Sequence, residues 1–263
     1  MPASGTLSSR RPPMVVDTLA TGGTHRSNPS TQALHRALGP QTGSAICDIA
    51  CGTGRLALSF AADYPARLVG VDPEPARLAA FRALAAARSV AVQTVRADAA
   101  ELPFPDGSFD LVTCRLAAHR FPDVPRAVGE MARLLRPGGR LAVIDLEGHE
   151  DPEIDALGNE LEVLRDPTHR RSHTRTEWIA LLKGAGLRVP VARGGQTEDR
   201  ADMPVRRRCD SAATATEASV RRRLAQAPAA HREALGIRAH GDAFLVPLRT
   251  CLVIGIKPRG GGR

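Results

Sequence analysis

The sequence is poor in aromatic residues and almost free of lysine. Phe, Tyr and Trp make up 3% of its 263 residues, and lysine occurs only at Lys183 and Lys257. Few aromatic rings leave few platforms on which single-stranded bases could stack. The net charge of +8 is therefore carried by arginine. The use of arginine in place of lysine, together with abundant Ala, Gly and Pro, indicates a GC-rich genome. On these grounds we expect no nucleic-acid partner.

A cysteine framework and a long apolar run are also missing. Five cysteines, an odd number without any C-x-x-C pair, argue against disulfides and against a zinc site. We therefore expect buried thiols, no metal and a reducing, cytoplasmic compartment. No stretch is long enough for a membrane span, and residues 1–25 predict a flexible arm, not a signal peptide.

Short apolar runs alternate with helical patterns along most of the chain. The runs are "SAICDIA", "RLVGVD", "VAVQTVRAD", "SFDLVTC", "GRLAVIDLE", "LRVPVA" and "RTCLVIGIKP". Helical spacing is found at Gly54–Ala62, Pro75–Ala86, Val124–Leu135, Asp151–Leu164 and Thr176–Ala185. Continuous apolarity predicts strands covered on both faces, and the alternation predicts βαβ units.

The pattern predicts an α/β fold of the doubly wound, Rossmann-like type. We expect a seven-stranded, mostly parallel sheet with an antiparallel last strand, formed by residues 26–193 and 245–258. Residues 194–244 are arginine-rich, with a helix expected at Glu217–Leu235 and no strand-like run. They predict a small helical cap inserted before the last strand, and residues 259–263 predict a flexible tail.

A glycine loop follows the first predicted strand in "DIACGTGRLA", residues 48–57. Gly52 and Gly54 fit G-x-G-x-x-A, which is also the dinucleotide fingerprint, and Asp72 closes the second strand as a ribose-binding acid would. However, Asp48 stands at the loop entrance, where its charge would repel a diphosphate. Asp98 adds a third carboxylate at the same sheet edge, so a cationic nucleoside fits better than a dinucleotide.

The segment from Ala45 to Glu147 resembles the class I S-adenosylmethionine (SAM)-dependent methyltransferases. Within that class it is most similar to the ubiquinone and menaquinone C-methyltransferase branch. The resemblance rests on "DIACGTG", "GVDPEPARL", "ADAAELPFPDGSFDLVTC" and "MARLLRPGGRLAVID", which occur in the family's order and spacing. It implies SAM as cofactor and S-adenosylhomocysteine as product.

The resemblance also implies a set of cofactor contacts. The backbone at Ala50, Cys51, Gly52 and Gly54 would wrap the methionine end of SAM, with Asp48 supporting the loop from below. Asp72 would bind the ribose hydroxyls, and Asp98 with the Ala99 amide would bind the adenine. The remaining expected contacts are Pro73 and Arg77 beside the adenine, and Cys114 and Arg115 at the end of the fourth strand.

Two further clusters are candidates for the chemistry. Arg115 and His119 follow the fourth strand four residues apart, which would place them on one side of a helical turn. His119 is the candidate general base, because an unperturbed imidazole titrates near neutral pH. In "RDPTHRRSHTR", His169 and Arg171 are candidate acceptor-binding residues, since arginine suits a carboxylate or phosphate.

These features predict in-line methyl transfer from SAM to a small molecule, either quinone-like or a secondary metabolite. Two alternatives stay open: an enzyme that binds SAM without consuming it in a cyclisation or rearrangement, and an RNA methyltransferase. The acceptor atom is not set by the sequence. Monomer and homodimer are both open.

Overall fold

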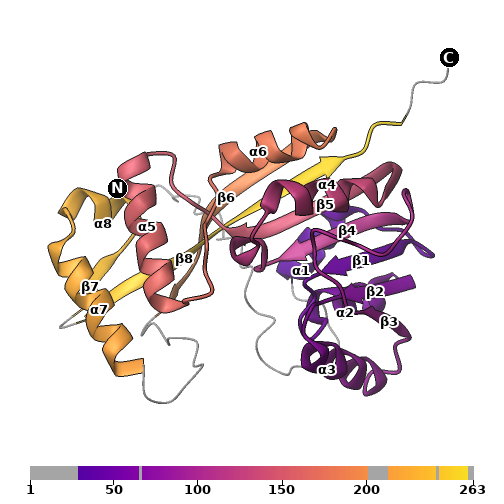
Figure 1. Cartoon of the computed structure of the whole chain (residues 1–263), viewed down its shortest axis with the longest axis horizontal. Coiled ribbons are helices and arrows are strands. Elements are labelled where there is room, and N and C mark those ends of the chain that lie inside the picture. The colour runs from indigo at the N-terminus through magenta and orange to yellow at the C-terminus, as the bar shows by residue number, and fades with distance from the viewer. Residues whose placement is uncertain (1–28, 65–66, 201–212, 241–242, 260–263) are drawn as a thin grey trace, which may run out of the picture.

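The computed structural model describes residues 29–64, 67–200, 213–240 and 243–259. Its main strands are β1 (Ala45–Ile49), β2 (Arg67–Val71), β3 (Val92–Val95), β4 (Phe109–Arg115), β5 (Leu135–Leu146), β6 (Arg188–Arg200) and β8 (Ala243–Ile256). Within the described residues they form one sheet in the order β3-β2-β1-β4-β5-β8-β6 (Figure 1). Strands β1 to β5 pair in parallel, and β8 pairs antiparallel with both β5 and β6. The predicted seven-stranded Rossmann-like sheet is confirmed.

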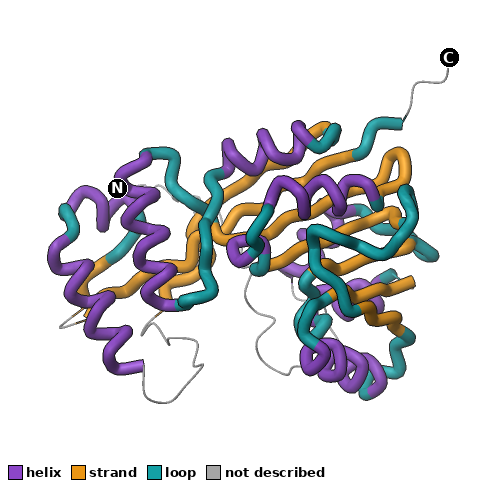
Figure 2. The backbone as a smooth tube through the Cα atoms, viewed as in Figure 1, coloured by secondary structure: helices purple, strands orange, loops and turns teal. Residues whose placement is uncertain are grey.

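Helices cover both faces of this sheet (Figure 2). Helices α1 (Pro29–Leu38) and α2 (Arg55–Asp63) pack on one face, and α3 (Pro75–Ala86) lies beside β3. Helices α4 (Val124–Arg133) and α6 (Arg175–Gly184) pack on the other face. Helix α1 was not expected from the sequence, whereas α2, α3, α4 and α6 fall where helical spacing predicts them.

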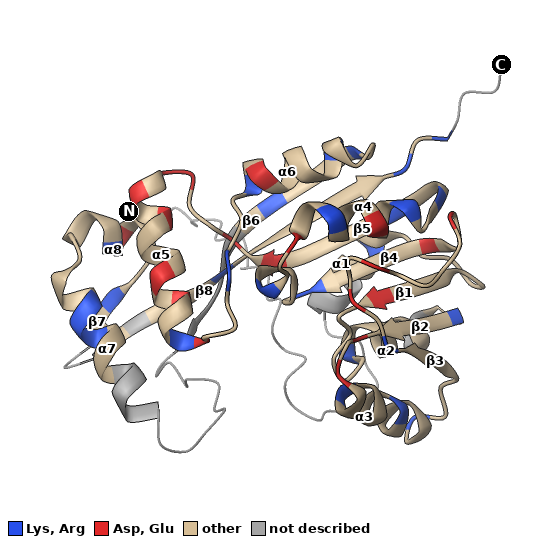
Figure 3. Ribbon diagram, viewed as in Figure 1, with Lys and Arg blue, Asp and Glu red and all other residues tan. Residues whose placement is uncertain are grey.

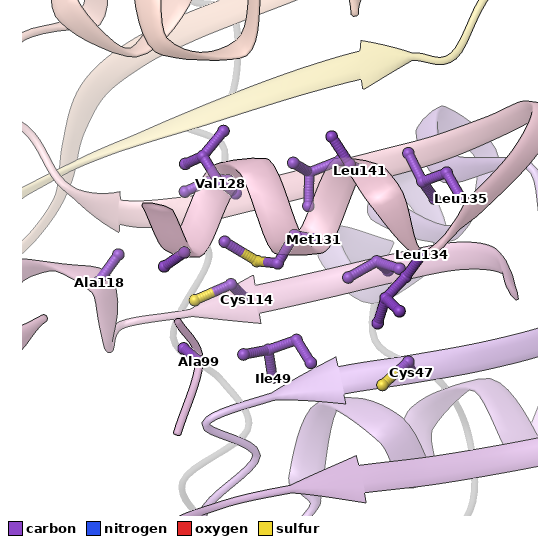
Figure 4. Packing of buried hydrophobic residues seen from close by; sticks show 14 of the residues in the cluster. Cys47, Ile49, Ala99, Cys114, Ala118, Val128, Met131, Leu134, Leu135 and Leu141 are labelled. Atoms are coloured by element: carbon purple, nitrogen blue, oxygen red, sulfur yellow. The ribbon is translucent and has the colours of Figure 1, made fainter. Parts of the chain in front are cut away.

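The spacing of apolar residues in α4 shows how the core forms. Val124, Ala127, Val128 and Met131 are buried at intervals of three and four residues, which places them on one helical face. They pack against Cys114 of β4 and other sheet residues (Figure 4). Met131 is fully buried, so truncating it to alanine should cost about 2–5 kcal/mol.

A second lobe forms beyond the carboxyl edge of the sheet. It contains α5 (Pro152–Arg165), α7 (Ala213–Gln226), α8 (Ala229–Ala234) and β7 (Arg238–His240), which pairs with the start of β8. A separate apolar cluster holds it together, formed by Leu157, Leu161, Val220, Leu224, Ala227, Leu235 and Ile237. Because α5 supplies Leu157 and Leu161, it belongs to this lobe and not to the main domain in which we expected it.

The expected cap boundaries also need correction. Strand β6 continues to Arg200, and Gly194 and Gly195 pair with Cys251 and Thr250 of β8. Pairing with the long apolar strand β8 thus extends β6 into a glycine-containing segment that has low strand propensity by itself. The single helix expected at 217–235 is two helices, since Pro228 caps the start of α8 and interrupts the helical hydrogen bonds.

Some expectations fall outside the described residues. These are the arm at residues 1–25 and all but the first residue of the tail at 259–263. In the part of the chain that the structure describes, Cys47, Cys51, Cys114 and Cys251 are free thiols. None of the helices described is long and apolar enough to cross a membrane.

Candidate functional site

The candidate site lies where the strand order reverses. Strand β1 has β2 on one side and β4 on the other, so the chain winds away from β1 in both directions. In open α/β sheets, ligands bind beyond the carboxyl ends of the strands at such a point. Figure 3 shows acidic residues near the ends of β1 and β5 at this edge. The segments that follow β1, β4 and β5 therefore bound the site.

The glycine loop after β1 has an unusual backbone. Ala50, Gly52 and Gly54 all have positive φ, at 52°, 54° and 71°. A Cβ on Gly54 would overlap the ring of Phe81 from α3, whereas a Cβ on Gly52 would meet no atom within 4 Å. Gly54 is thus required for packing, and Gly52 leaves open space above the loop where a ligand could approach.

Asp48 lies beneath this loop and is 2% exposed. Thr113 donates a hydrogen bond to its carboxylate at 2.7 Å, and the Ala57 amide in the first turn of α2 donates another. Burial raises the pKa of Asp48 to about 6, against the opposing effects of Thr113 and the charge of Arg115. Through the Ala57 amide and Thr113, Asp48 thus ties the first turn of α2 to β4.

Asp72 is tied to the same loop. Its Oδ2 accepts a hydrogen bond from the Gly52 amide at 2.9 Å, and its Oδ1 accepts one from the Glu74 amide at 3.0 Å. Asp72 is 1% exposed, so ribose hydroxyls would have to use the remaining lone pairs of the carboxylate. Asp98 is exposed at the end of the segment after β3, and its Oδ1 accepts from the Ala100 amide at 2.8 Å.

The other expected cofactor contacts differ in their surroundings. Pro73 is exposed and Ala99 is buried. The guanidinium of Arg77 pairs with Glu74 at 2.9 Å, so an adenine would meet an ion pair there. The Cys114 thiol is 1% exposed and packs in the core, so its side chain does not fit the expected cofactor contact.

These residues fit the nucleoside and methionine parts of SAM. The space above Gly52 accepts close approach by a ligand, and the carboxylates of Asp48 and Asp72 lie near enough to raise the pKa of Cys51. Two buried carboxylates under a loop suit a ligand with sulfonium and ammonium charges. They oppose a pyrophosphate, which is the group that a dinucleotide would bring to this helix N-terminus.

His119 is the best-defined polar side chain at the edge. It lies in a 3-10 turn, η1 (Ala118–Arg120), and is 5% exposed. Its Nδ1 lies 2.5 Å from Oδ1 of Asp145 at the end of β5, and its amide donates to Oδ2 at 2.9 Å. Arg115 is the last residue of β4 and acts on Asp48 instead. The expected helical turn shared by Arg115 and His119 is therefore wrong, because Leu116 breaks it with a φ of 50°.

The loop between α5 and α6 closes over His119. The ring of His169 stacks on the ring of His119 with centroids 5.3 Å apart and planes 26° apart. The backbone amides of Arg170 and Arg171 both donate to the His119 carbonyl. The Arg171 side chain pairs with Asp155 and Glu177, and these two carboxylates oppose the binding of an acceptor carboxylate or phosphate by Arg171.

A cleft lies beside the two histidines, and its volume is about 530 Å³ when the space open to solvent at its mouth is included. We call it the histidine cleft. Its lining consists of Leu116, His119, Arg120, Leu146, Glu162, Arg165, Asp166, His169 and Leu248. Cys114 of β4 pairs with Ile49 of β1 on one side and with Val143 of β5 on the other, so the glycine loop after β1 and the histidine turn after β4 adjoin at the same edge.

Sequence reasoning missed three residues of this site. Asp145 is the last residue but one of β5. It follows the strand-end pattern that singled out Asp48, Asp72 and Asp98, so it could have been found. The helical Asn159, which contacts His169 at 3.2 Å, carries no signal in the sequence. Leu116 is missed because nothing in the sequence marks a leucine that adopts positive φ.

Comparison with known proteins agrees with this geometry. Residues 47–143 match the family model described as "Methyltransferase domain". An uncharacterized methyltransferase of Bacillus subtilis, YcgJ, is 40% identical over 143 residues, which are 54% of this chain and 56% of the relative. A demethylmenaquinone methyltransferase of Thermus thermophilus is 48% identical over 101 residues, which are 38% of this chain and 46% of the relative.

The chain thus spans about half the length of these curated relatives. The crystal structure of the Bacillus subtilis YcgJ protein superposes with a TM-score of 0.74 at 29% identity, covering 88% of this chain and 98% of that one. Fold, loop and family model therefore agree. Residues 47–143 of the chain match a methyltransferase domain, for which S-adenosyl-L-methionine is the cofactor, and the relatives of the chain include quinone methyltransferases.

Proposed function

We propose that this chain transfers the methyl group of SAM to a small molecule held in the histidine cleft. The observation that carries the proposal is the adjacency of the glycine loop and the cleft. Both lie at the carboxyl edge of the sheet, where β4 pairs with β1 on one side and with β5 on the other. A donor on the loop and an acceptor in the cleft would therefore meet at the ends of β1 and β4.

The proposed cofactor contacts are those that the resemblance to SAM-dependent methyltransferases implies, and the open space above Gly52 supports them. Asp48 and the backbone at Ala50, Cys51, Gly52 and Gly54 hold the methionine part, and Asp72 holds the ribose. Asp98 and Ala99 hold the adenine beside Pro73 and Arg77. When bound, SAM supplies an activated methyl carbon, and the work of the chain is to align the acceptor with it and to exclude water.

His119 is the proposed general base. Asp145 orients its ring through Nδ1, which leaves Nε2 to take a proton from the acceptor. Arg115, next to Asp48, is proposed to contact both cofactor and acceptor. Such a base contributes about 10²- to 10⁴-fold to the rate when the acceptor must lose a proton.

The lining of the cleft favours an uncharged acceptor. Leu116, Leu146 and Leu248 give it apolar walls. Its arginines are paired, Arg120 with Asp166 at 2.6 Å and Arg165 with Glu162 at 2.5 Å. A quinone-like or other neutral ring compound fits this combination, and the quinone methyltransferases among the relatives support that acceptor class.

The test combines binding with product analysis. We expect calorimetry to show binding of SAM and S-adenosylhomocysteine, and binding of NAD alone would contradict the proposal. Isotopically labelled SAM supplied with extracts of the source organism should label a small molecule and release S-adenosylhomocysteine. His119→Gln should abolish labelling while SAM binding stays intact, with His231→Gln as a control outside the cleft.

Turnover without S-adenosylhomocysteine would replace this proposal with a reaction in which SAM is not consumed. Label recovered in RNA, with binding that weakens steeply as salt is added, would replace it with RNA methylation. RNA methylation would use the arginine-rich segment before the last strand as a phosphate clamp. Arg206–Arg208 of this segment lie outside the described residues, and Arg223 pairs with Glu160 at 2.7 Å.

A further inference from the structure

The tautomer of His119 is set by its partners. The two oxygens of Asp145 accept backbone hydrogen bonds from Leu146 at 2.7 Å and from His119 itself at 2.9 Å. The carboxylate therefore accepts, and the Nδ1 that lies against it carries the hydrogen. The unprotonated nitrogen of the neutral ring is Nε2, which presents a lone pair.

The tautomer of His169 is set independently by Asn159. The Asn159 Nδ2 donates to the Asp155 carbonyl at 3.1 Å, and its Oδ1 accepts from the Ser172 amide at 2.6 Å. These two backbone partners fix which amide atom is oxygen. Since Oδ1 can only accept, the Nε2 of His169 at 3.2 Å must donate to it, and Nδ1 carries the lone pair.

Two imidazoles thus offer two acceptor nitrogens to one cleft. Among the described residues, nothing forms a hydrogen bond with Nε2 of His119 or Nδ1 of His169, and neither atom is enclosed. Both rings line the cleft and stack nearly parallel. Burial lowers the pKa of His169 to about 4, so this ring stays neutral at physiological pH.

A pair of adjacent acceptors selects a ligand with a pair of adjacent donors. A site built to bond a hydroxyl rejects the analogue that lacks it, because the buried polar group is then left unsatisfied. Carbonyl oxygens facing the two lone pairs would be repelled, so among quinone-like acceptors the cleft favours the reduced form, which carries hydroxyl groups. The charged side chains of the cleft are mutually paired, so the donors need not be charged.

We propose that His169 is a second acceptor-binding residue, and that the acceptor presents two neighbouring hydroxyl groups, as a catechol does, to His119 and His169. This inference rests on the proposed function for the assignment of the cleft to the acceptor. One hydroxyl faces the base His119 and the other binds His169. His169 therefore determines specificity without taking part in proton transfer.

The test measures binding of three probes to the full chain saturated with S-adenosylhomocysteine. The probes are 4-methylcatechol with adjacent hydroxyls, methylhydroquinone with opposed hydroxyls, and 4-methylphenol with one. We expect 4-methylcatechol to bind about tenfold more tightly than either other probe, as one further hydrogen bond allows. His169→Phe keeps the stacked ring and removes the lone pair, so it should bring the ratio close to one.

His231→Phe on α8, outside the cleft, is the matched control and should preserve the tenfold ratio. Binding of S-adenosylhomocysteine by each variant shows that its domain is folded. If the wild type does not bind S-adenosylhomocysteine, the result counts against the proposed function and not against this inference. Equal affinity of the wild type for all three probes, no binding of 4-methylcatechol, or an unchanged ratio in His169→Phe would overturn the inference.

Discussion

Gly54 of the loop lies directly against the ring of Phe81 from α3. A Cβ at position 54 would overlap this ring, whereas a Cβ at position 52 would enter open space. Both glycines have positive φ. Two glycines of one motif are thus required for different reasons, one for the packing of α2 against α3 and the other for access to the loop.

This difference predicts that alanine at position 54 mainly reduces stability, whereas alanine at position 52 mainly reduces SAM binding. Gly54→Ala should destabilise the protein by about 2–4 kcal/mol, because overpacking adds to the cost of positive φ. Gly52→Ala should cost only about 1–2 kcal/mol but weaken SAM binding at least about tenfold. Thermal unfolding and calorimetry measure the two effects. Equal loss of stability in both variants would show that Gly52 also serves packing.

The strand-end carboxylates could be predicted from sequence, but their partners could not. Asp48, Asp72 and Asp98 were identifiable because parallel strands bring their carboxyl ends to one edge. The pairing of His119 with Asp145, 26 residues away, depends on the register of β4 and β5. The lobe assignment of α5 also escaped prediction, because amphipathic spacing shows that one face is buried without showing what covers it.

The raised pKa of Asp48 predicts that SAM binding is coupled to proton release. A positively charged ligand favours the ionised carboxylate, so SAM should lower this pKa from about 6. If binding lowers it by one unit, affinity for SAM rises about fivefold between pH 5 and pH 7, and the full difference of about tenfold is reached only at lower pH. Calorimetry in buffers of different ionisation enthalpy measures the released proton.

Asp48→Asn should flatten this pH dependence. Asp110→Asn, at the opposite end of the sheet where Asp110 pairs with Arg136, is the control and should keep it. A pH-independent affinity in the wild type would mean that Asp48 does not sense the charge of the ligand.

Asp48 and His169 predict opposed effects of pH on stability. The folded pKa of Asp48 is raised from 3.8 to about 6, so its contribution is present below pH 3.8 and is lost as pH rises through 6. The folded pKa of His169 is lowered from 6.5 to about 4, so its contribution is present above pH 6.5 and is lost as pH falls through 4. Each amounts to about 3 kcal/mol.

The two variants should therefore change the pH dependence in opposite directions. In the Asp48→Asn variant only the contribution of His169 remains. Its free energy of unfolding should therefore fall, relative to that of the wild type, as the pH is lowered from 6.5 to 4. In the His169→Phe variant only the contribution of Asp48 remains. Its free energy of unfolding should therefore fall, relative to that of the wild type, as the pH rises over this range. Urea unfolding at pH 4.5, 5.5 and 6.5 checks both signs, and parallel profiles for all three proteins would contradict them.

Asp145→Asn should reduce catalysis without reducing SAM binding. An amide in place of the carboxylate no longer holds His119 in the tautomer that presents Nε2, so kcat should fall about 10²-fold or more. An unchanged kcat together with lower thermal stability would instead assign Asp145 a structural role.

The ion pair between Arg120 and Asp166 ties the histidine turn to the loop that carries His169. Arg120 donates to Asp166 at 2.6 Å and to Thr168 at 3.0 Å. Although partial burial opposes ionisation, bonds from Thr168 and Arg120 hold the pKa of Asp166 well below its ordinary value. Arg120→Met should thus loosen the loop and raise KM for the acceptor several-fold, while affinity for SAM stays constant.

A double-mutant cycle with Asp166→Asn tests this coupling. Because both side chains are about a quarter exposed, the pair should contribute about 1 kcal/mol or less to global stability. Its effect should therefore be seen in KM for the acceptor, where the double variant should be no worse than either single one. Additive losses in KM would show that Arg120 and Asp166 contact the acceptor separately and do not act through their ion pair.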